Sequence, residues 1–304
     1  MGKGYDENVP AMKMNWQSKF VLLVVLPFAA ADVVLQAHWW ATQSPEVAIW
    51  TAGLSLLLGL VTWKLRAATP AAAFAGAVIT ASLMFSTAMF PYQPWHTALA
   101  PVLAVSLLAY ATTRLGKEEK QRLGTAERHS GRTAAQVAAN LGVAALVSCE
   151  FFQSWMTDSQ IFTRSTPVPM PLFAVGLAAL AEAAADTVSS EFGQVFGGRP
   201  RMITTLRPVE PGTDGAISLT GTLAGVVAAG IVAVAGTVAL NGDRTMFAVS
   251  CAGGVFGLLF DSLLGATLER RGWLNNDAVN FLSTASAAGF ALGVLALLPH
   301  PGVG

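Results

Sequence analysis

Charged residues are scarce in this chain. Asp, Glu, Lys and Arg make up only 12% of its 304 residues, and they cancel to a formal net charge of +0. A soluble domain carries about 25% charged residues, so the shortage argues against an ordinary soluble protein. The neutral balance also argues against nucleic acid as a partner, because nucleic-acid-binding proteins present an excess of Lys and Arg.

Cysteine and histidine are also rare. The 2 cysteines, Cys149 and Cys251, lie in apolar segments without CxxC spacing. They are therefore interpreted as small core residues and not as a disulfide framework or a metal site. The 4 histidines are scattered along the chain and form no ligand pattern. Any chemistry must therefore come from carboxylates, hydroxyls, arginines and backbone groups.

Apolar sequence is abundant: 53% of the residues are hydrophobic, and the mean hydropathy is +0.54. A membrane-spanning helix needs about 20 mainly apolar residues. We therefore predict an all-α polytopic integral membrane protein with about nine transmembrane helices. The expected spans are Phe20–Trp40, Val47–Leu65, Pro70–Phe90, Trp95–Thr113, Thr133–Trp155, Pro169–Ser189, Ala216–Leu240, Met246–Leu268 and Val279–Leu298.

The basic residues give these spans an orientation, because cytoplasmic loops carry an excess of Lys and Arg. With the N-terminus inside, only Arg164 and Arg244 of the 18 Lys and Arg residues fall outside. We predict an inside N-terminus and an outside C-terminus, in a bacterial inner membrane. The expected parts are a cytoplasmic segment 1–19, one membrane domain 20–298 with cytoplasmic loops at about 114–132 and 190–215, and a tail 299–304.

Carboxylates interrupt the sixth expected span, in the stretch "ALAEAAADTVSSEFG". Glu182 and Asp186 are one helical turn apart, and Ser190 and Glu191 follow toward the inner interface. Charged groups at membrane depth are costly and usually mark a functional site. A structural carboxylate paired with a basic side chain is the alternative.

The loop after this span, "GGRPRMITTLRPVEPGTDGAISLTG", is rich in Gly, Pro and Thr. Its glycines allow backbone N–H groups to face an anion, and its hydroxyls and arginines suit phosphate oxygens. It has no Lys after its glycines, so it is not a Walker P-loop. An ordinary turn is the alternative. The candidate phosphate-binding residues are Arg199, Arg201, Gly212, Thr213, Gly215 and Ser218.

A third cluster, "GGVFGLLFDSLLGATLERRGWLNNDAVN", places Asp261 on a stripe of glycines. A smooth stripe lets another helix approach closely and buries Asp261. With Mg²⁺ the carboxylate is an oxygen ligand of the type that this ion requires; a protonated structural Asp is the alternative. Ser262, Asn276 and Asn280 are nucleotide-binding candidates, although the asparagines could equally cap the last helix.

The basic loop "TRLGKEEKQRLGTAERHSGR" mixes both signs of charge, and topology and solvation alone could explain it. Arg114 and Arg132 stand closest to the expected helix ends, which makes them candidates for binding a phosphate. Lys120 in the loop and Asn140 on the following span complete the candidate set.

The series "TRLG…K…GR…QVAAN", "ADTVSSEFG", "PGTDGAISLTG" and "GLLFDSLLGATLE…NN…N" resembles the DUF92 family, from about Gly59 to Leu298. That family contains the transmembrane protein 19 group and the phytyl-phosphate kinases of vitamin E (tocopherol) synthesis. The chain departs from the family pattern at Val188-Ser189, Asp214 and Glu269, and no carboxylate is lost.

The resemblance implies a membrane kinase that transfers a phosphoryl group from CTP or ATP to an isoprenyl monophosphate, such as phytyl or geranylgeranyl phosphate. Asp186, Glu191 and Asp261 would be catalytic, and with Glu182 they would bind Mg²⁺ or Mn²⁺ at the cytoplasmic face. Three rivals stay open: a transporter or flippase for a lipid phosphate or small anion, a cytidylyltransferase and a phosphatase. The oligomeric state also stays open.

Overall fold

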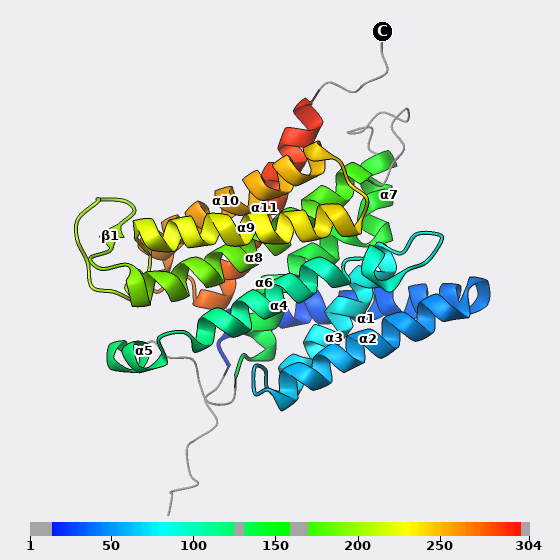
Figure 1. Cartoon of the computed structure of the whole chain (residues 1–304), viewed down its shortest axis with the longest axis horizontal. Coiled ribbons are helices and arrows are strands. Elements are labelled where there is room, and N and C mark those ends of the chain that lie inside the picture. The colour runs from blue at the N-terminus through cyan, green and yellow to red at the C-terminus, as the bar shows by residue number, and fades with distance from the viewer. Residues whose placement is uncertain (1–13, 125–130, 159–169, 299–304) are drawn as a thin grey trace, which may run out of the picture.

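The computed structural model describes residues 14–124, 131–158 and 170–298, and these form a bundle of helices (Figure 1). The helices are α1 (Trp16–Gln43), α2 (Pro45–Lys64), α3 (Pro70–Ser86), η1 (Pro94–His96), α4 (Leu99–Arg114), α5 (Lys117–Leu123), α6 (Ala134–Ser148), α7 (Glu150–Asp158), α8 (Met170–Phe196), α9 (Leu219–Ala239), α10 (Arg244–Leu264), the π-helical turn η2 (Gly265–Glu269) and α11 (Asn276–Leu297). Two-residue strands β1 (Arg201–Met202) and β2 (Ala216–Ile217) pair antiparallel in the loop before α9.

Polar side chains mark where the helices begin. Thr133 and Gln136 form a reciprocal capping box at the start of α6. The side chains of Ser218, Asp243 and Asn275 accept hydrogen bonds from the first turns of α9, α10 and α11. Such caps satisfy backbone N–H groups that have no partner inside the helix. They also fix where the loops around the candidate site begin.

Six helices are long and apolar enough to cross a membrane, or up to seven if the α6–α7 pair, bent by 53°, is one span. The other two expected spans, α3 and α4, are helical but have only 17 and 16 residues. The chain is therefore a helical integral membrane protein. The prediction of about nine transmembrane helices is not confirmed, and the orientation of the termini stays a prediction.

Helix α8 is the centre of the bundle: it packs against α4, α6, α9, α10 and α11 (Figure 1). Its apolar window is 83% buried, and half of the buried side chains are alanines. Small side chains allow helix backbones to approach closely in a membrane, where packing replaces the hydrophobic effect. The carboxylates of α8 are therefore carried by the most enclosed helix of the structure.

The loops differ in detail from the sequence prediction. The first expected loop, 114–132, contains the short helix α5. The second begins later than residue 190, because α8 continues to Phe196. Ser190 and Glu191 are therefore helical, and irregular backbone with the small β1–β2 pair follows from Gly197.

Candidate functional site

A polar cavity of about 240 Å³ lies where α8, α10, η2 and the loop before α9 meet. We call it the acidic cavity, because Asp186, Asp214, Asp261 and Glu269 line it. The three sequence clusters therefore come together as predicted. The predicted site residues in its lining are Asp186, Ser190, Gly212, Thr213, Gly215, Ser218, Asp261, Ser262 and Asn276.

Close packing of α10 on α8 brings two of these carboxylates together. A Cβ added to Gly254 would lie 2.8 Å from Ala181, and one added to Gly257 would lie 2.4 Å from Cγ of Glu182. One turn beyond Glu182 on α8 and beyond Gly257 on α10, Asp186 and Asp261 both line the acidic cavity, close enough for their charges to interact. The buried Oδ2 of Asp261 has no hydrogen-bond partner within residues 14–124, 131–158 and 170–298.

The glycine loop forms the opposite wall. Gly212 and Gly215 have φ of 82° and 74°, a conformation that strongly favours glycine. Gly215 also presses on η2, since a Cβ there would lie 2.3 Å from the backbone nitrogen of Ala266. The π-helical turn places Glu269 in the same cavity, and such turns occur often at functional sites.

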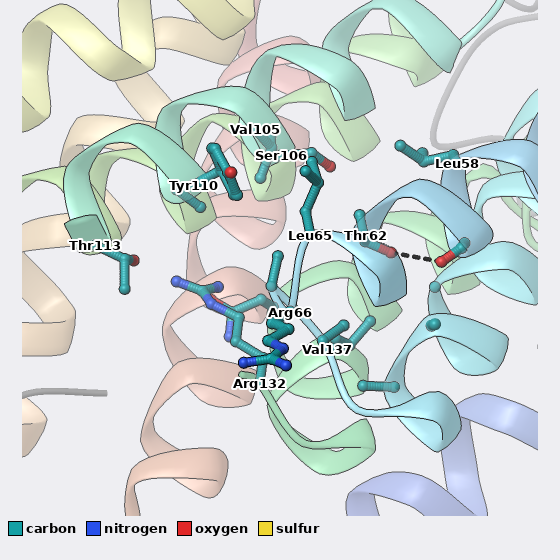
Figure 2. A pocket seen from close by; sticks show the side chains of 18 of the residues that line it. Leu58, Thr62, Leu65, Arg66, Val105, Ser106, Tyr110, Thr113, Arg132 and Val137 are labelled. Carbon is teal, nitrogen blue, oxygen red and sulfur yellow. Dashed lines mark hydrogen bonds between the residues drawn. The ribbon is translucent and has the colours of Figure 1, made fainter. Parts of the chain in front are cut away.

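A second cavity, of about 290 Å³, lies between α4 and the group formed by α2, α3 and α6 (Figure 2). We call it the basic cleft. Its lining includes the predicted residues Arg114, Lys120, Arg132 and Asn140. Asn140 is buried, and its side chain donates a 2.7 Å hydrogen bond to the Gln136 carbonyl. That bond occupies one of its two N–H groups within α6.

The turn between α2 and α3 gathers arginines at one end of the basic cleft. Nη2 of Arg114 donates to the Leu65 carbonyl at 2.8 Å, and the backbone N–H of Arg132 donates to the Ala67 carbonyl at 3.0 Å. Arg66 lies between these two acceptors, and Figure 2 shows it beside Arg132. The Arg114 guanidinium also stacks on the Tyr110 ring, 3.6 Å from its centroid. Backbone carbonyls therefore hold two of the three arginines, Arg114 and Arg132, at this end of the cleft.

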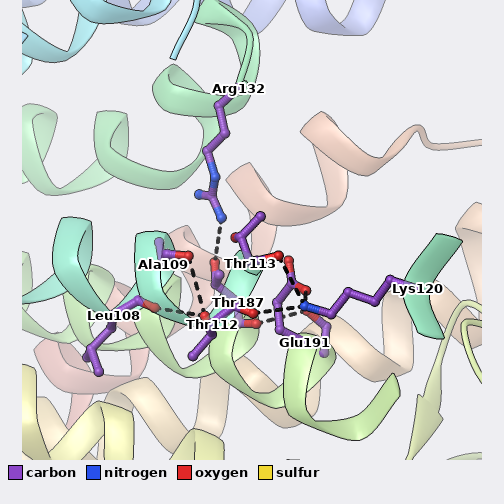
Figure 3. Close-up of polar contacts among 9 residues, drawn as sticks. Leu108, Ala109, Thr112, Thr113, Lys120, Arg132, Thr187 and Glu191 are labelled. Atoms are coloured by element: carbon purple, nitrogen blue, oxygen red, sulfur yellow. Dashed lines mark hydrogen bonds and ion pairs between the residues drawn. The ribbon is translucent and has the colours of Figure 1, made fainter. Parts of the chain in front are cut away.

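Arg132 lines the basic cleft and reaches toward the acidic cavity. Its Nη2 donates to Oγ1 of Thr187 at 3.3 Å (Figure 3), and its positive charge acts on the neighbouring Asp186. The guanidinium therefore lies between the carboxylates of the acidic cavity and the arginines of the basic cleft. An anion bound in either cavity would be attracted by the positive charge of Arg132.

Lys120 and Glu191 form a buried ion pair between α5 and α8 (Figure 3). The Lys120 ammonium also donates to the carbonyls of Thr112 and Thr113, at 2.8 and 3.3 Å, and so caps the end of α4. Glu191 thus points to Lys120, and it does not line the acidic cavity. The structure therefore shows Glu191 as a carboxylate paired with a basic side chain, an alternative that the sequence raised for Glu182 and Asp186 and not for Glu191.

Besides Glu191, four predicted residues lie outside both cavities. Glu182 is buried against Gly257 deeper in the bundle. Arg199 and Arg201 are exposed, and Arg201 donates to the Leu206 carbonyl at 2.8 Å. Asn280 is half-buried on α11. Their proposed roles stay predictions.

In the described part of the chain, no three His, Cys, Asp or Glu side chains form a metal-binding group. Asp186 and Asp261 supply two carboxylates, with Asp214 and Glu269 on the surrounding walls. Mg²⁺ is usually held by one or two carboxylates together with substrate phosphates and water. The donors present fit a cation that shares its ligands with a bound phosphate, and they do not form a complete protein cage.

Several lining residues were not singled out from the sequence: Arg66, Tyr110, Lys117, Asp214 and Glu269. Arg66 was only one of the basic residues used to orient the spans, and Asp214 and Glu269 were noted only as departures from a family pattern. The position of Arg66 depends on a positive φ of 55°, which no sequence pattern indicates.

Together these features define a class: a polytopic helical membrane protein with an acidic cavity and a basic cleft, and with one arginine between them. The chain belongs to the family described as "Integral membrane protein DUF92", whose model matches residues 53–288. No solved structure matches the chain.

Curated relatives include two uncharacterized membrane proteins. One, from Methanocaldococcus jannaschii, is 46% identical over 39% of this chain and 49% of its own length. The other, from Synechocystis, is 33% identical over 64% of this chain and 72% of its own. Protein VTE6, chloroplastic, from Arabidopsis thaliana is 30% identical over 60% of this chain and 54% of its own length. The matched region therefore spans only about half the length of the Methanocaldococcus jannaschii protein and of VTE6.

Proposed function

We propose that this protein is a membrane kinase that transfers the terminal phosphoryl group of CTP or ATP to an isoprenyl monophosphate, giving the diphosphate. The observation that carries the proposal is that Arg132, which lines the arginine-rich cleft, donates to Thr187, the residue next to Asp186 of the acidic cavity. Phosphoryl transfer requires mostly positioning and neutralisation of charge. Two polyanions must be held close together, and this arrangement offers a separate site for each.

The acidic cavity is the proposed nucleotide site. Asp186 and Asp261 would hold Mg²⁺ or Mn²⁺ together with phosphate oxygens, because both line this cavity and Oδ2 of Asp261 has no partner among the described residues. The bound cation would neutralise charge on the triphosphate. The N–H groups of the Gly212–Gly215 turn and the hydroxyls of Thr213 and Ser218 would bind phosphate oxygens from the opposite wall.

The basic cleft is the proposed acceptor site. Arg114 and Arg132 stand at its charged end and would bind the acceptor phosphate through planar, charge-assisted hydrogen bonds. The rest of its lining is mainly apolar and suits an isoprenyl tail. Glu191 and Lys120 would then act by positioning, since their ion pair ties α5 and α4 to α8.

The chemical step would be an in-line exchange at the terminal phosphorus. An oxygen of the acceptor phosphate forms the new P–O bond, the bond to the bridging oxygen breaks, and the nucleoside diphosphate leaves. The acceptor is already an anion, so no general base is required. Arg132 would hold the two phosphates near each other, since it reaches Thr187 and acts on Asp186.

We further propose that this site faces the cytoplasm in a bacterial inner membrane. Nucleoside triphosphates are available on that side. The loops that bear most of the basic residues, including those with Arg66, Arg114 and Arg132, lie around the two cavities. This agrees with the rule that cytoplasmic loops are enriched in Lys and Arg.

The test is product identification with the purified full chain in detergent. The protein is incubated with Mg²⁺, with CTP or ATP, and with phytyl, geranylgeranyl or farnesyl phosphate, and both products are identified by mass spectrometry. We expect an isoprenyl diphosphate and a nucleoside diphosphate in equal amounts. Pyrophosphate with a cytidylyl lipid, inorganic phosphate with a free alcohol, or no reaction with any pair would each overturn the proposal.

A further inference from the structure

The basic cleft lies between two groups of helices that pack little on each other. Helix α3 packs on α2 and α6, whereas α4 packs mainly on α8 and α9 and has little contact with α2 or α3. Leu58 and Ser106 line the cleft, while the adjacent Leu57 and Leu107 are exposed, by 53% and 66%. The edges of the cleft therefore belong to helix faces that a bilayer would surround.

The lining changes from charged to apolar along the cleft. On α4 it runs from Arg114 through Tyr110 and Val105 to Val102. At 1.5 Å per residue this is a length of about 18 Å. Gly76 and Thr80 of α3 also line the cleft, about 9 and 15 Å along that helix from its start at Pro70, just after the arginine-bearing turn. This polarity is that of a single lipid chain with an anionic head.

Arg66 has an unusual position at the charged end. Its φ of 55° is uncommon for a residue with a side chain. No hydrogen bond or ion pair of its guanidinium is found within the described residues. Arg114 instead donates to the Leu65 carbonyl, and Arg132 contacts Thr187. Arg66 therefore offers its donors to a ligand at a point already flanked by two cations.

The two glycines in the lining differ in what surrounds them. A Cβ on Gly59 would lie 2.8 Å from the Ala73 carbonyl oxygen, so this glycine is required for packing of α2 on α3. A Cβ on Gly76 would meet only Val137 Cγ1, at an ordinary 3.7 Å. Space is therefore available beside Gly76 that a longer side chain could fill.

We infer that the basic cleft takes the acceptor sideways from the bilayer, binds its phosphate at Arg66 and limits its tail at Gly76. The occupant is an isoprenyl monophosphate, with one apolar chain and one dianionic head. This inference rests on the proposed function and extends it, because it names the residues that select the acceptor. Arg66 would bind the head independently of tail length, and Gly76 would act only on tails that reach it.

The test measures binding without catalysis. Full-chain protein in detergent, without nucleotide, is titrated with radiolabelled geranyl phosphate and geranylgeranyl phosphate. The Gly76→Leu variant is expected to weaken binding of the longer lipid about tenfold or more, because a blocked methylene-sized space costs that much, and to leave the shorter lipid nearly unchanged. Gly53→Leu is the matched control, since Gly53 is exposed on α2, outside the cleft, with nothing within 4 Å.

The Arg66→Gln variant is expected to weaken the binding of both lipids equally, by about tenfold, because it loses a charge-assisted hydrogen bond to the phosphate. Arg207→Gln, at an exposed residue outside both cavities, should bind as wild type does. The inference would be overturned if Gly76→Leu weakened the binding of both lipids equally, or if neither variant bound lipid more weakly than wild type. Full displacement of the lipids by inorganic phosphate or phosphatidic acid would also overturn it. If the lipids bind in the expected pattern but no phosphoryl transfer occurs, the proposed kinase activity is wrong and the proposed lipid site stands.

Discussion

Asp186 of α8 and Asp261 of α10 both line the acidic cavity, where their carboxyl groups are close enough for their charges to interact. This close approach depends on glycines of α10, because a Cβ at Gly254 or Gly257 would collide with α8. Two carboxyl groups this close in an enclosed site repel each other when both are ionised. A bound cation would relieve that repulsion, so the pair is the natural place to test the proposed metal.

The first prediction concerns this pair. Asp186→Asn and Asp261→Asn should each lower phosphoryl transfer by about 10²-fold or more, the scale of losing one group that stabilises developing charge. The thermal unfolding temperature should stay the same or rise, since an uncompensated buried carboxylate is removed. Release of nucleoside diphosphate is the measurement. Asp243→Asn is the control, because Asp243 only caps α10 and Asn caps equally well. Full activity in both cavity variants would remove the metal assignment.

The second prediction concerns Lys120 and Glu191. Lys120→Met should destabilise the protein by about 3–5 kcal/mol, because it leaves a largely buried carboxylate without its cation. The double variant Lys120→Met/Glu191→Met should recover most of this loss, and a double-mutant cycle on thermal unfolding in detergent measures the coupling. If Glu191 were mainly a metal ligand, the double variant would stay stable but lose activity completely. Retained activity would establish the pair as structural.

The positions of these carboxylates were largely predictable, and their partners were not. Helical periodicity places Glu182, Asp186 and Glu191 along α8, so the sequence alone indicated polar groups on a buried helix. Which of them meets Asp261 and which meets Lys120 depends on the packing of α10 and α5 around α8. Contacts between helices so far apart in sequence have no local pattern.

The helix ends and loops show the same limit. Capping residues such as Ser218 and Asn275 mark helix starts in the sequence because their chemistry is local. The end of α8 at Phe196 was missed because "SSEFGQVF" contains Gly and Ser, which usually favour an earlier end. Tertiary packing of Gly193 and Gly197 on Ser218 overrides that preference, since added Cβ atoms would lie 3.2 and 2.8 Å from Ser218 Oγ.

The third prediction concerns the glycine loop. Gly215→Ala should be strongly destabilising and should abolish transfer, because it combines a positive φ with a collision against Ala266. Gly198→Ala separates these causes, since Gly198 also has a positive φ, of 61°, but nothing lies within 4 Å of an added Cβ. It should cost only about 1–2 kcal/mol and keep its activity. The measurements are the thermal unfolding temperature and the nucleotide KM of both variants. If the two variants lost the same stability and activity, close packing of Gly215 against η2 would not be what holds the loop in place.

The fourth prediction uses two adjacent asparagines. Asn275 caps α11 and donates to Oγ of Ser18 at 2.8 Å, whereas Asn276 is exposed and lines the acidic cavity. Asn275→Ala should therefore lower the free energy of unfolding by about 1 kcal/mol or more, with nucleotide KM unchanged. Asn276→Ala should raise nucleotide KM several-fold with no loss of stability, because an exposed side chain outside the cap contributes little to folding. Each variant controls for the other: an Asn276→Ala protein with unaltered KM at every nucleotide tested would place the nucleotide away from the start of α11.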